Sequence, residues 1–121
     1  MFLQLAHTKT EIFQQSKKLA LECYRVTKDF PNEERFAIVQ QIRRAALSVH
    51  LNIAEGSSRK SELERKRYYE IARGSVIEID AAIGLAHELN YVQSSTLQTL
   101  GELIVSNFKQ LSALINKFSA S

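Results

Sequence analysis

The 121-residue sequence contains one proline, one cysteine, four glycines and no tryptophan. A single proline is far below the usual share of about 5%, and a sheet-rich chain of this length needs many Gly, Pro and Asn turns. The scarcity of turn residues therefore argues against a β-sandwich or barrel and favours a few long helices. The lone Cys23 excludes a disulfide within the chain and is typical of a reducing cytoplasm, which is the location we expect.

Long apolar runs are also missing. No stretch approaches the roughly 18 consecutive apolar residues of a membrane span. Residues 1–10 lack the basic and apolar regions of a signal peptide. We therefore expect no membrane partner and no secretion. The length fits one domain over residues 1–121, which can bury a core without a disulfide or a structural metal.

Three breaks divide the chain into four segments of helical length, at residues 30–32, 56–58 and 90–95. Within each segment apolar residues recur at spacings of three and four, the pattern of a core-facing helix. The spacing predicts helices over about residues 9–30, 33–55, 62–90 and 95–118. Short connections favour antiparallel neighbours, so the predicted fold is all-α, an antiparallel up-down four-helix bundle.

Local signals predict where these helices begin and end. Asn32, followed by two glutamates, is typical of an N-cap, and Gly56 is typical of a left-handed helix terminator. The tetrapeptide SELE at residues 61–64 matches a capping box. Gly74 lies inside the third predicted helix, where glycine costs about 1 kcal/mol relative to alanine. We expect the close approach of another backbone to compensate for it.

Catalytic motifs are scarce in this sequence. Three histidines lie on separate segments without metal-ligand spacing: His7, His50 and His87. The Glu-x-x-His pairs of a di-iron bundle are absent, as are a nucleophile elbow, a phosphate-binding loop and a dinucleotide motif. Cys23 lies on the core stripe of its helix, where we expect an inert thiol. We therefore expect a protein that is no enzyme and holds no cofactor or metal; an enzyme would need a histidine beside Glu55 or Glu78 in a cleft.

Positive charge gathers in one part of the chain. Residues 59–73 hold six basic and three acidic side chains, whereas residues 74–121 hold two basic and four acidic ones. Lysine and arginine neutralise phosphates, and tyrosine rings stack on unpaired bases. The candidate nucleic-acid interface is therefore Arg59, Lys60, Arg65, Lys66, Arg67, Tyr68, Tyr69 and Arg73. The alternative is a solvated helix face in which these bases pair with Glu62, Glu64 and Glu70.

Two further sets of residues stand out on the predicted helices. Arg43 lies beside the core stripe, where a buried cation needs a partner, and the candidate polar network is Arg43, Asn52, Glu55 and Glu78. The neighbouring Arg44 shares a second face with two leucines, and the fourth predicted helix is broadly apolar. Such surfaces indicate burial against a partner, so the candidate oligomer interface is Arg44, Leu47, Leu51, Leu103 and Leu114. Scattered surface leucines are the alternative.

These motifs resemble the signature of a bacterial family of four-helix bundles, named after the protein encoded in intervening sequences of the 23S ribosomal RNA gene. The stretches QIRRAALS at residues 41–48 and NIAEG at residues 52–56 carry the resemblance. It extends over about residues 12–91. The further matches are Phe30-Pro31, Glu33-Glu34-Arg35, Arg59, Ser61, Ile71-Ala72, Gly74-Ser75 and Glu78.

The resemblance implies a four-helix bundle that assembles into a homopentameric ring or barrel. Similar bundles serve as accessory subunits of retroelement reverse transcriptases, where a basic surface engages nucleic acid. The sequence departs from the family pattern near His50, where a proline is common, and at residues 5–9, which lack the usual aromatic residues. The resemblance supplies no catalytic residues. Our first hypothesis is a homo-oligomer that binds RNA or another nucleic acid; the alternative is a protein–protein interaction scaffold or accessory subunit without nucleic-acid binding.

Overall fold

The computed structural model describes residues 2–119 of the chain. Four long helices are present: α1 (Glu11–Thr27), α2 (Ile38–Ser58), α3 (Glu62–Glu88) and α4 (Gln98–Ser119). Three short 3₁₀ helices accompany them: η1 (Ala6–Lys9), η2 (Asn32–Glu34) and η3 (Ser94–Leu97). Residues 2–119 contain no strand, so the prediction of an all-α chain with four helices is confirmed. None of the described helices combines the length and the apolar character that crossing a membrane requires.

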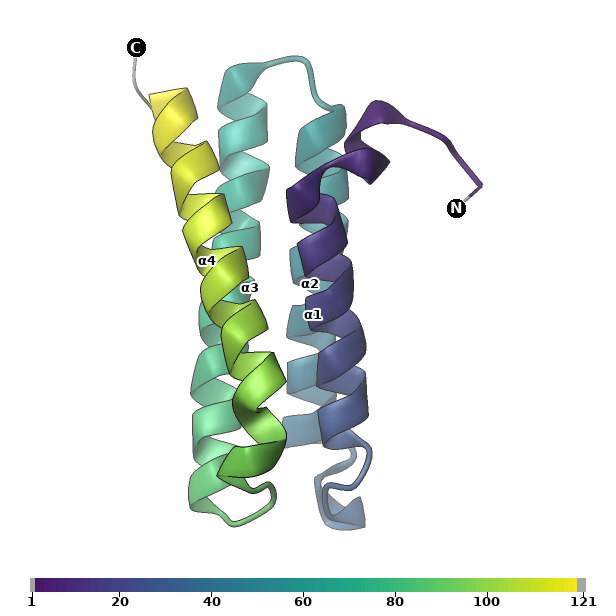
Figure 1. Cartoon of the computed structure of the whole chain (residues 1–121), viewed down its shortest axis with the longest axis vertical. Helices are drawn as coiled ribbons and strands as arrows, with labels where there is room; N and C mark the ends of the chain where they lie inside the picture. The colour runs from purple at the N-terminus through teal and green to yellow at the C-terminus, as the bar shows by residue number, and fades with distance from the viewer. Residues whose placement is uncertain (1, 120–121) are drawn as a thin grey trace.

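The four helices lie side by side, and the chain reverses direction at each connection (Figure 1). α1 and α3 each pack against both α2 and α4. The α2–α3 connection, η1 and the last turn of α4 lie at one end of the bundle, which we call the upper end. η2 and η3 lie at the opposite end, which we call the lower end.

The core is built from apolar side chains that the spacing of three and four brings to one side of each helix. Fully buried large side chains come from all four helices, and examples are Leu19, Ile42, Ile53, Ile79, Leu100 and Leu111. Burying one such side chain contributes about 1.5–3 kcal/mol. Packing of these faces, rather than helix propensity, therefore holds the bundle together.

The starts of the helices are capped in different ways. The Thr10 hydroxyl accepts a hydrogen bond from the Phe13 amide at 3.4 Å, and the Ser61 hydroxyl accepts one from the Glu64 amide at 3.3 Å. The cap predicted at Ser61 is thus confirmed. The cap predicted at Asn32 is wrong, because Asn32 and the two glutamates form η2 and α2 begins only after Ala37, which offers no side-chain cap.

α3 ends in a Schellman motif. Asn90 has a φ of 63°, the one positive φ of a non-glycine residue among those described, and asparagine tolerates this conformation better than most residues. The Tyr91 amide donates to the Ala86 carbonyl and the Asn90 amide to the His87 carbonyl, both at 3.0 Å. The Tyr91 ring then lies 5.9 Å from that of Phe30, which joins the end of α3 to the end of α1.

Gly56 lies inside α2 and does not end it. No glycine among residues 2–119 has a positive φ, so the predicted left-handed terminator is wrong. Gly56 is buried because α3 begins against it: a Cβ there would lie 2.9 Å from Tyr68 Cβ and 3.1 Å from Tyr69 Cε1. The close approach predicted at Gly74 is also wrong, since a Cβ there would meet no atom within 4 Å. The tight contact that glycine permits is therefore at residue 56.

We predict that Gly56→Ala lowers the free energy of unfolding by about 1–3 kcal/mol, because the added methyl group forces a packed side chain to move. The matched control, Gly74→Ala, adds the same group in open space and should raise that free energy by about 0.5–1 kcal/mol. Urea unfolding followed by circular dichroism measures both changes. Equal effects of the two substitutions would contradict the assignment of the tight contact to Gly56.

Candidate nucleic-acid interface

The candidate nucleic-acid interface lies mainly at the upper end, at the connection between α2 and α3. Arg59 follows α2 in an extended conformation and Ser61 caps α3, so the connection is short. Arg65, on the first turn of α3, reaches back and donates from Nε to the Arg59 carbonyl. The structure therefore brings Arg59, Lys60 and Arg65 together around one tight connection.

Arg59 is the most firmly held of these cations. Its Nη2 donates to Glu55 Oε2 at 2.9 Å and to Tyr68 Oη at 3.2 Å, and its guanidinium lies 5.2 Å from the centre of the Tyr68 ring. The pKa of Arg59 is raised, chiefly by Tyr68 and further by Glu55, while burial opposes the rise. Arg59 Nε is buried without a partner. The main role of Arg59 is therefore to stabilise the connection between α2 and α3.

The two tyrosines of the candidate interface differ in exposure. Tyr69 is 5% exposed, its hydroxyl lies 2.9 Å from Ser57 Oγ, and its ring stacks on Phe118 with centroids 6.1 Å apart. The prediction that Tyr69 is available to stack on a base is therefore wrong, because the helix turns it into the core. Tyr68 lies about 100° further round the helix; it is half-buried, with Arg59 over its ring.

The remaining cations of the candidate interface differ in exposure and in position. Lys60 and Arg67 are exposed and Lys66 is half-buried. Arg73 lies further down the helix and reaches across to α4, where its Nη1 donates to Ser112 Oγ at 3.2 Å. Arg73 therefore belongs to the packing between α3 and α4 rather than to the upper end.

Local ion pairing does not neutralise the upper end. Over residues 2–119 the structure has two ion pairs, which join Arg25 to Glu22 and Arg59 to Glu55. Neither pair involves the acidic residues in the first turns of α3: Glu62, Glu64 and Glu70. The geometry thus gives no support to the alternative of a salt-bridged helix face.

The predicted polar network does not form. Arg43 turns toward α1, where its Nε donates to Thr27 Oγ1 at 2.9 Å and its guanidinium lies 4.8 Å from the centre of the Tyr24 ring. Glu55 and Glu78 are both exposed. The prediction is wrong because α1 supplies a hydroxyl and an aromatic ring to this half-buried cation, which removes the need for a carboxylate.

Asn52, the other member of that network, bonds within α2. Its Nδ2 donates to the Ser48 carbonyl at 2.8 Å and to Ser48 Oγ at 3.1 Å. Ser48 Oγ also accepts a hydrogen bond from Ser75 Oγ of α3 at 2.8 Å. A pair of small polar residues therefore fixes the register of α2 against α3, and only the serines at these spacings signal it in the sequence.

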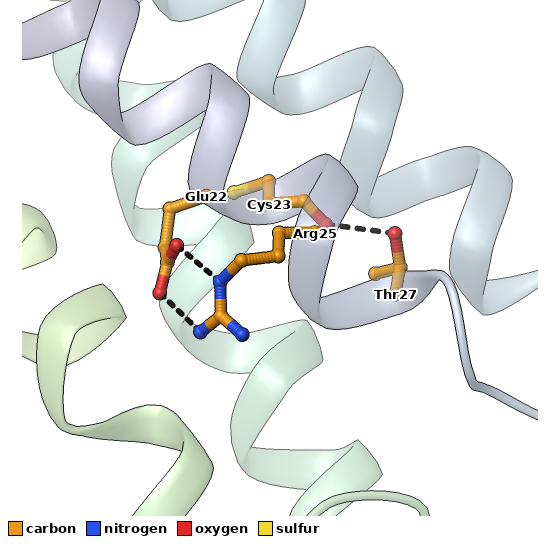
Figure 2. Close-up of polar contacts among 4 residues, drawn as sticks. All are labelled: Glu22, Cys23, Arg25 and Thr27. Carbon is orange, nitrogen blue, oxygen red and sulfur yellow. Dashed lines mark hydrogen bonds and ion pairs between the residues drawn. The ribbon is translucent and has the colours of Figure 1, made fainter.

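Thr27, the partner of Arg43, is fixed by the last turn of α1. Its hydroxyl donates to the Cys23 carbonyl at 2.7 Å, and the neighbouring Arg25 forms two hydrogen bonds with Glu22 at 2.7 and 2.6 Å (Figure 2). Burial, with a smaller contribution from Glu22, raises the pKa of the Cys23 thiol to about 12. The thiol is therefore protonated at neutral pH and inert as a nucleophile.

The candidate oligomer-interface residues fall into two groups. On α2, Arg44, Leu47 and Leu51 are exposed, the two leucines by 44% and 57%. On α4, Leu103 and Leu114 are half-buried and pack against the core of their own bundle. The assignment of these two residues to an outer face is wrong, because they lie at the edge of the core stripe. The exposed large apolar side chains of α4 are Val105 and Phe108.

His50 joins α2 to α1. His50 Nδ1 lies 2.7 Å from Ser16 Oγ, and the two rings of His50 and Phe13 are 4.6 Å apart. Because the Ser16 hydroxyl donates to the Phe13 carbonyl at 2.9 Å, His50 donates to Ser16. Burial, and then the charge of Lys17, lowers the pKa of His50.

The described part of the chain has no group of three His, Cys, Asp or Glu side chains that could hold a metal ion.

The lowered pKa of His50 predicts a pH-dependent stability. The unfolded histidine, with a pKa of about 6.5, takes up its proton before the folded one, so stability is retained above that pH and lost as the pH falls through the folded pKa. The urea midpoint of the wild type should fall over this range, and His50→Gln should fall less. His87→Gln, at an exposed histidine, is the control and should follow the wild type. Identical pH profiles for H50Q and the wild type would contradict this prediction.

Fold and site together define a class: a small four-helix bundle with a basic connection between α2 and α3 and exposed leucines on α2. The chain belongs to the family of 23S rRNA-intervening sequence proteins, whose sequence profile matches residues 8–113. The family prediction from the motifs is therefore confirmed.

A solved structure shares the fold. It is the crystal structure of a protein of unknown function from the S23 ribosomal protein family of Bacteroides thetaiotaomicron, with a TM-score of 0.79. The sequences are 21% identical over 86% of this chain and 97% of that chain. At this identity the likeness shows the fold alone. A search of the curated proteins gives no match.

Proposed function

We propose that the upper end of the bundle binds nucleic acid, with RNA as the first candidate. The observation that carries the proposal is a set of cations that form no ion pair with a carboxylate of residues 2–119: Lys60, Arg65, Lys66 and Arg67. Such cations can neutralise phosphates and release the counterions condensed on them, which is the main source of affinity in sequence-independent binding. The match to the 23S rRNA-intervening sequence family is compatible with this proposal.

The proposed contacts are with the phosphate backbone more than with bases. The core holds Tyr69, and Arg59 covers one face of Tyr68, so little aromatic surface remains for stacking. We therefore propose binding with weak sequence preference and without a catalytic step, in the cytoplasm.

The double substitution Lys60→Gln/Arg67→Gln tests this proposal. It removes two exposed cations of the upper end, so the plot of log affinity against log salt should become shallower by about 1.4–1.8, at roughly 0.7–0.9 per phosphate contact. Fluorescence anisotropy with a labelled RNA hairpin that carries a single-stranded tail measures affinity and slope.

Lys18→Gln/Lys28→Gln is the matched control for that experiment. Both lysines are exposed on α1 or at its end, away from the upper-end connection, and the loss of charge is the same. The control should change the slope much less. The proposal fails if the wild type shows no salt-sensitive RNA binding near physiological ionic strength, or if both double variants change the slope equally.

The exposure of Leu47 and Leu51 favours a second proposed function, self-assembly into a scaffold. Two adjacent exposed leucines on one face of α2 gain free energy when a partner covers them. We propose a homo-oligomer on this basis, and the family resemblance favours a pentameric ring. In a pure scaffold, reversing the charges of Arg65 and Arg67 leaves the partner bound, whereas in an RNA-binding assembly it abolishes binding.

Leu47→Asp/Leu51→Asp should convert the assembly to monomers. Each substitution would place an unpaired carboxylate in the covered surface, and burying it costs several kcal/mol. Leu63→Asp, at a leucine that is 77% exposed near the start of α3, is the control and should leave the assembly intact. Light scattering after size exclusion at micromolar concentration measures the mass, and a monomeric wild type would contradict self-assembly.

A further inference from the structure

Two grooves of opposite charge lie toward the lower end of the bundle. The basic groove has a volume of about 510 Å³ at the start of α2, and its lining includes Arg35, Phe36, Arg43, Arg44 and Leu47. The acidic groove has a volume of about 410 Å³ between α3 and α4, and the carboxylates that line it belong to Asp80 and Glu102. Among the described residues, no acidic side chain lines the basic groove, and no lysine or arginine lines the acidic one.

Two of the residues that line the acidic groove are glycines, which leave its space unfilled. Gly84 of α3 and Gly101 of α4 both line it, and a Cβ at either position would meet no atom within 4 Å. The groove also contacts the core, because buried Ile83, Leu100 and Ile104 are among its lining residues. An apolar side chain from outside could therefore enter between α3 and α4 and reach the edge of the core.

The basic groove presents such a side chain. Phe36 is 80% exposed, so its own chain leaves most of the ring uncovered. The Arg35 guanidinium lies 5.3 Å from the centre of the Phe36 ring, and Arg44 is exposed on the next turns of α2. An exposed aromatic ring flanked by arginines is the kind of group that dominates the binding energy of protein interfaces.

Arg44 of the basic groove and Asp80 of the acidic groove lie at about the same height along the bundle. The Ser48–Ser75 hydrogen bond aligns α2 with α3, which run in opposite directions (Figure 1). Arg44 is four residues before Ser48 and Asp80 is five residues after Ser75, so at about 1.5 Å per residue both lie roughly 6–7.5 Å below that bond. The α1–α2 pair and the α3–α4 pair form opposite sides of the bundle (Figure 1).

We infer that the basic groove of one copy of this chain docks onto the acidic groove of a second copy. Phe36 enters the space above Gly84 and Gly101, while Arg35 and Arg44 pair with the two carboxylates of the acidic groove. Charge complementarity and equal height favour a second copy as the single occupant of both grooves. The inference rests on the proposed self-assembly and identifies the contact that produces it.

The position of the two grooves also restricts the symmetry of the assembly. Because the two surfaces differ and lie on opposite sides, the contact is head-to-tail, and it leaves one free groove at each end of a pair. Repeating it closes a ring when the rotation between copies permits. A closed ring requires that successive copies share one orientation without a shift along the bundle, and the similar height of Arg44 and Asp80 is compatible with this.

Gly84→Leu and Gly101→Leu test the docking directly. Each fills the acidic groove from within, and the open space at both positions means that the monomer should keep its fold and its urea midpoint. We expect the concentration for half-assembly to rise by roughly tenfold or more. Gly74→Leu is the control, since it adds the same side chain in open space on α3 but outside the groove, and should assemble like the wild type.

A charge exchange tests which groups pair. Asp80→Arg/Glu102→Arg should weaken assembly, and so should Arg35→Glu/Arg44→Glu. The protein that combines all four substitutions should recover assembly, because opposite charges face each other again. Sedimentation velocity over a concentration series, with circular dichroism as the check on folding, measures each variant.

The outcomes separate the docking from the proposed self-assembly. A wild type that assembles while G84L and G101L assemble equally well, or a fourfold charge variant without recovery, overturns the docking and leaves self-assembly standing. A monomeric wild type overturns both. Loss of RNA binding in Arg35→Glu/Arg44→Glu, with assembly unchanged, shows that the basic groove takes an anion and also overturns the docking.

Discussion

The close approach of α3 to α2 at Gly56 is the constraint on which the upper end depends. A side chain at residue 56 would occupy the space of Tyr68 and Tyr69, so α3 can start against α2 only where this residue has none. The approach turns Tyr69 into the core and leaves Tyr68 outside under Arg59. The basic residues that follow α2 and those that begin α3 are thereby gathered around one short connection.

The Gly56 contact and the Ser48–Ser75 hydrogen bond together set the register of α2 against α3. Residues 56 and 68 meet at the upper end, Ser48 and Ser75 meet in the middle, and antiparallel helices that rise about 1.5 Å per residue keep this register downward. Arg44 and Asp80 therefore come to one height on different faces of the bundle. These two contacts thus relate the height of the basic end to that of Arg44 and Asp80 lower in the bundle.

The sequence predicts which residues form helices better than it predicts which side chains contact each other across helices. Apolar spacing predicts the four helices, and Ser61 predicts the start of α3. Both signals depend on residues that are close together in the chain. The sequence predicts a network of Arg43 with Glu55 and Glu78, yet the partners of Arg43 lie on α1. A residue at the edge of a core stripe can face either adjacent helix, and only the packed structure decides which. The prediction that Tyr69 stacks on a base is wrong for a different reason: Tyr69 shares the spacing of three and four with buried Ala72 and Val76, which places it on the core face whatever its basic neighbours are.

The two proposed surfaces support each other when the copies share one orientation. Head-to-tail docking at equal height places every upper end on the same side of the assembly, because no copy is inverted. In the proposed ring, the basic connections at residues 59–67 of successive copies would lie along one rim. A strand bound at one copy would then be present at a raised effective concentration at the next, without any new kind of contact. On this proposal, a modest charge of +3 per chain acts through its placement and its repetition.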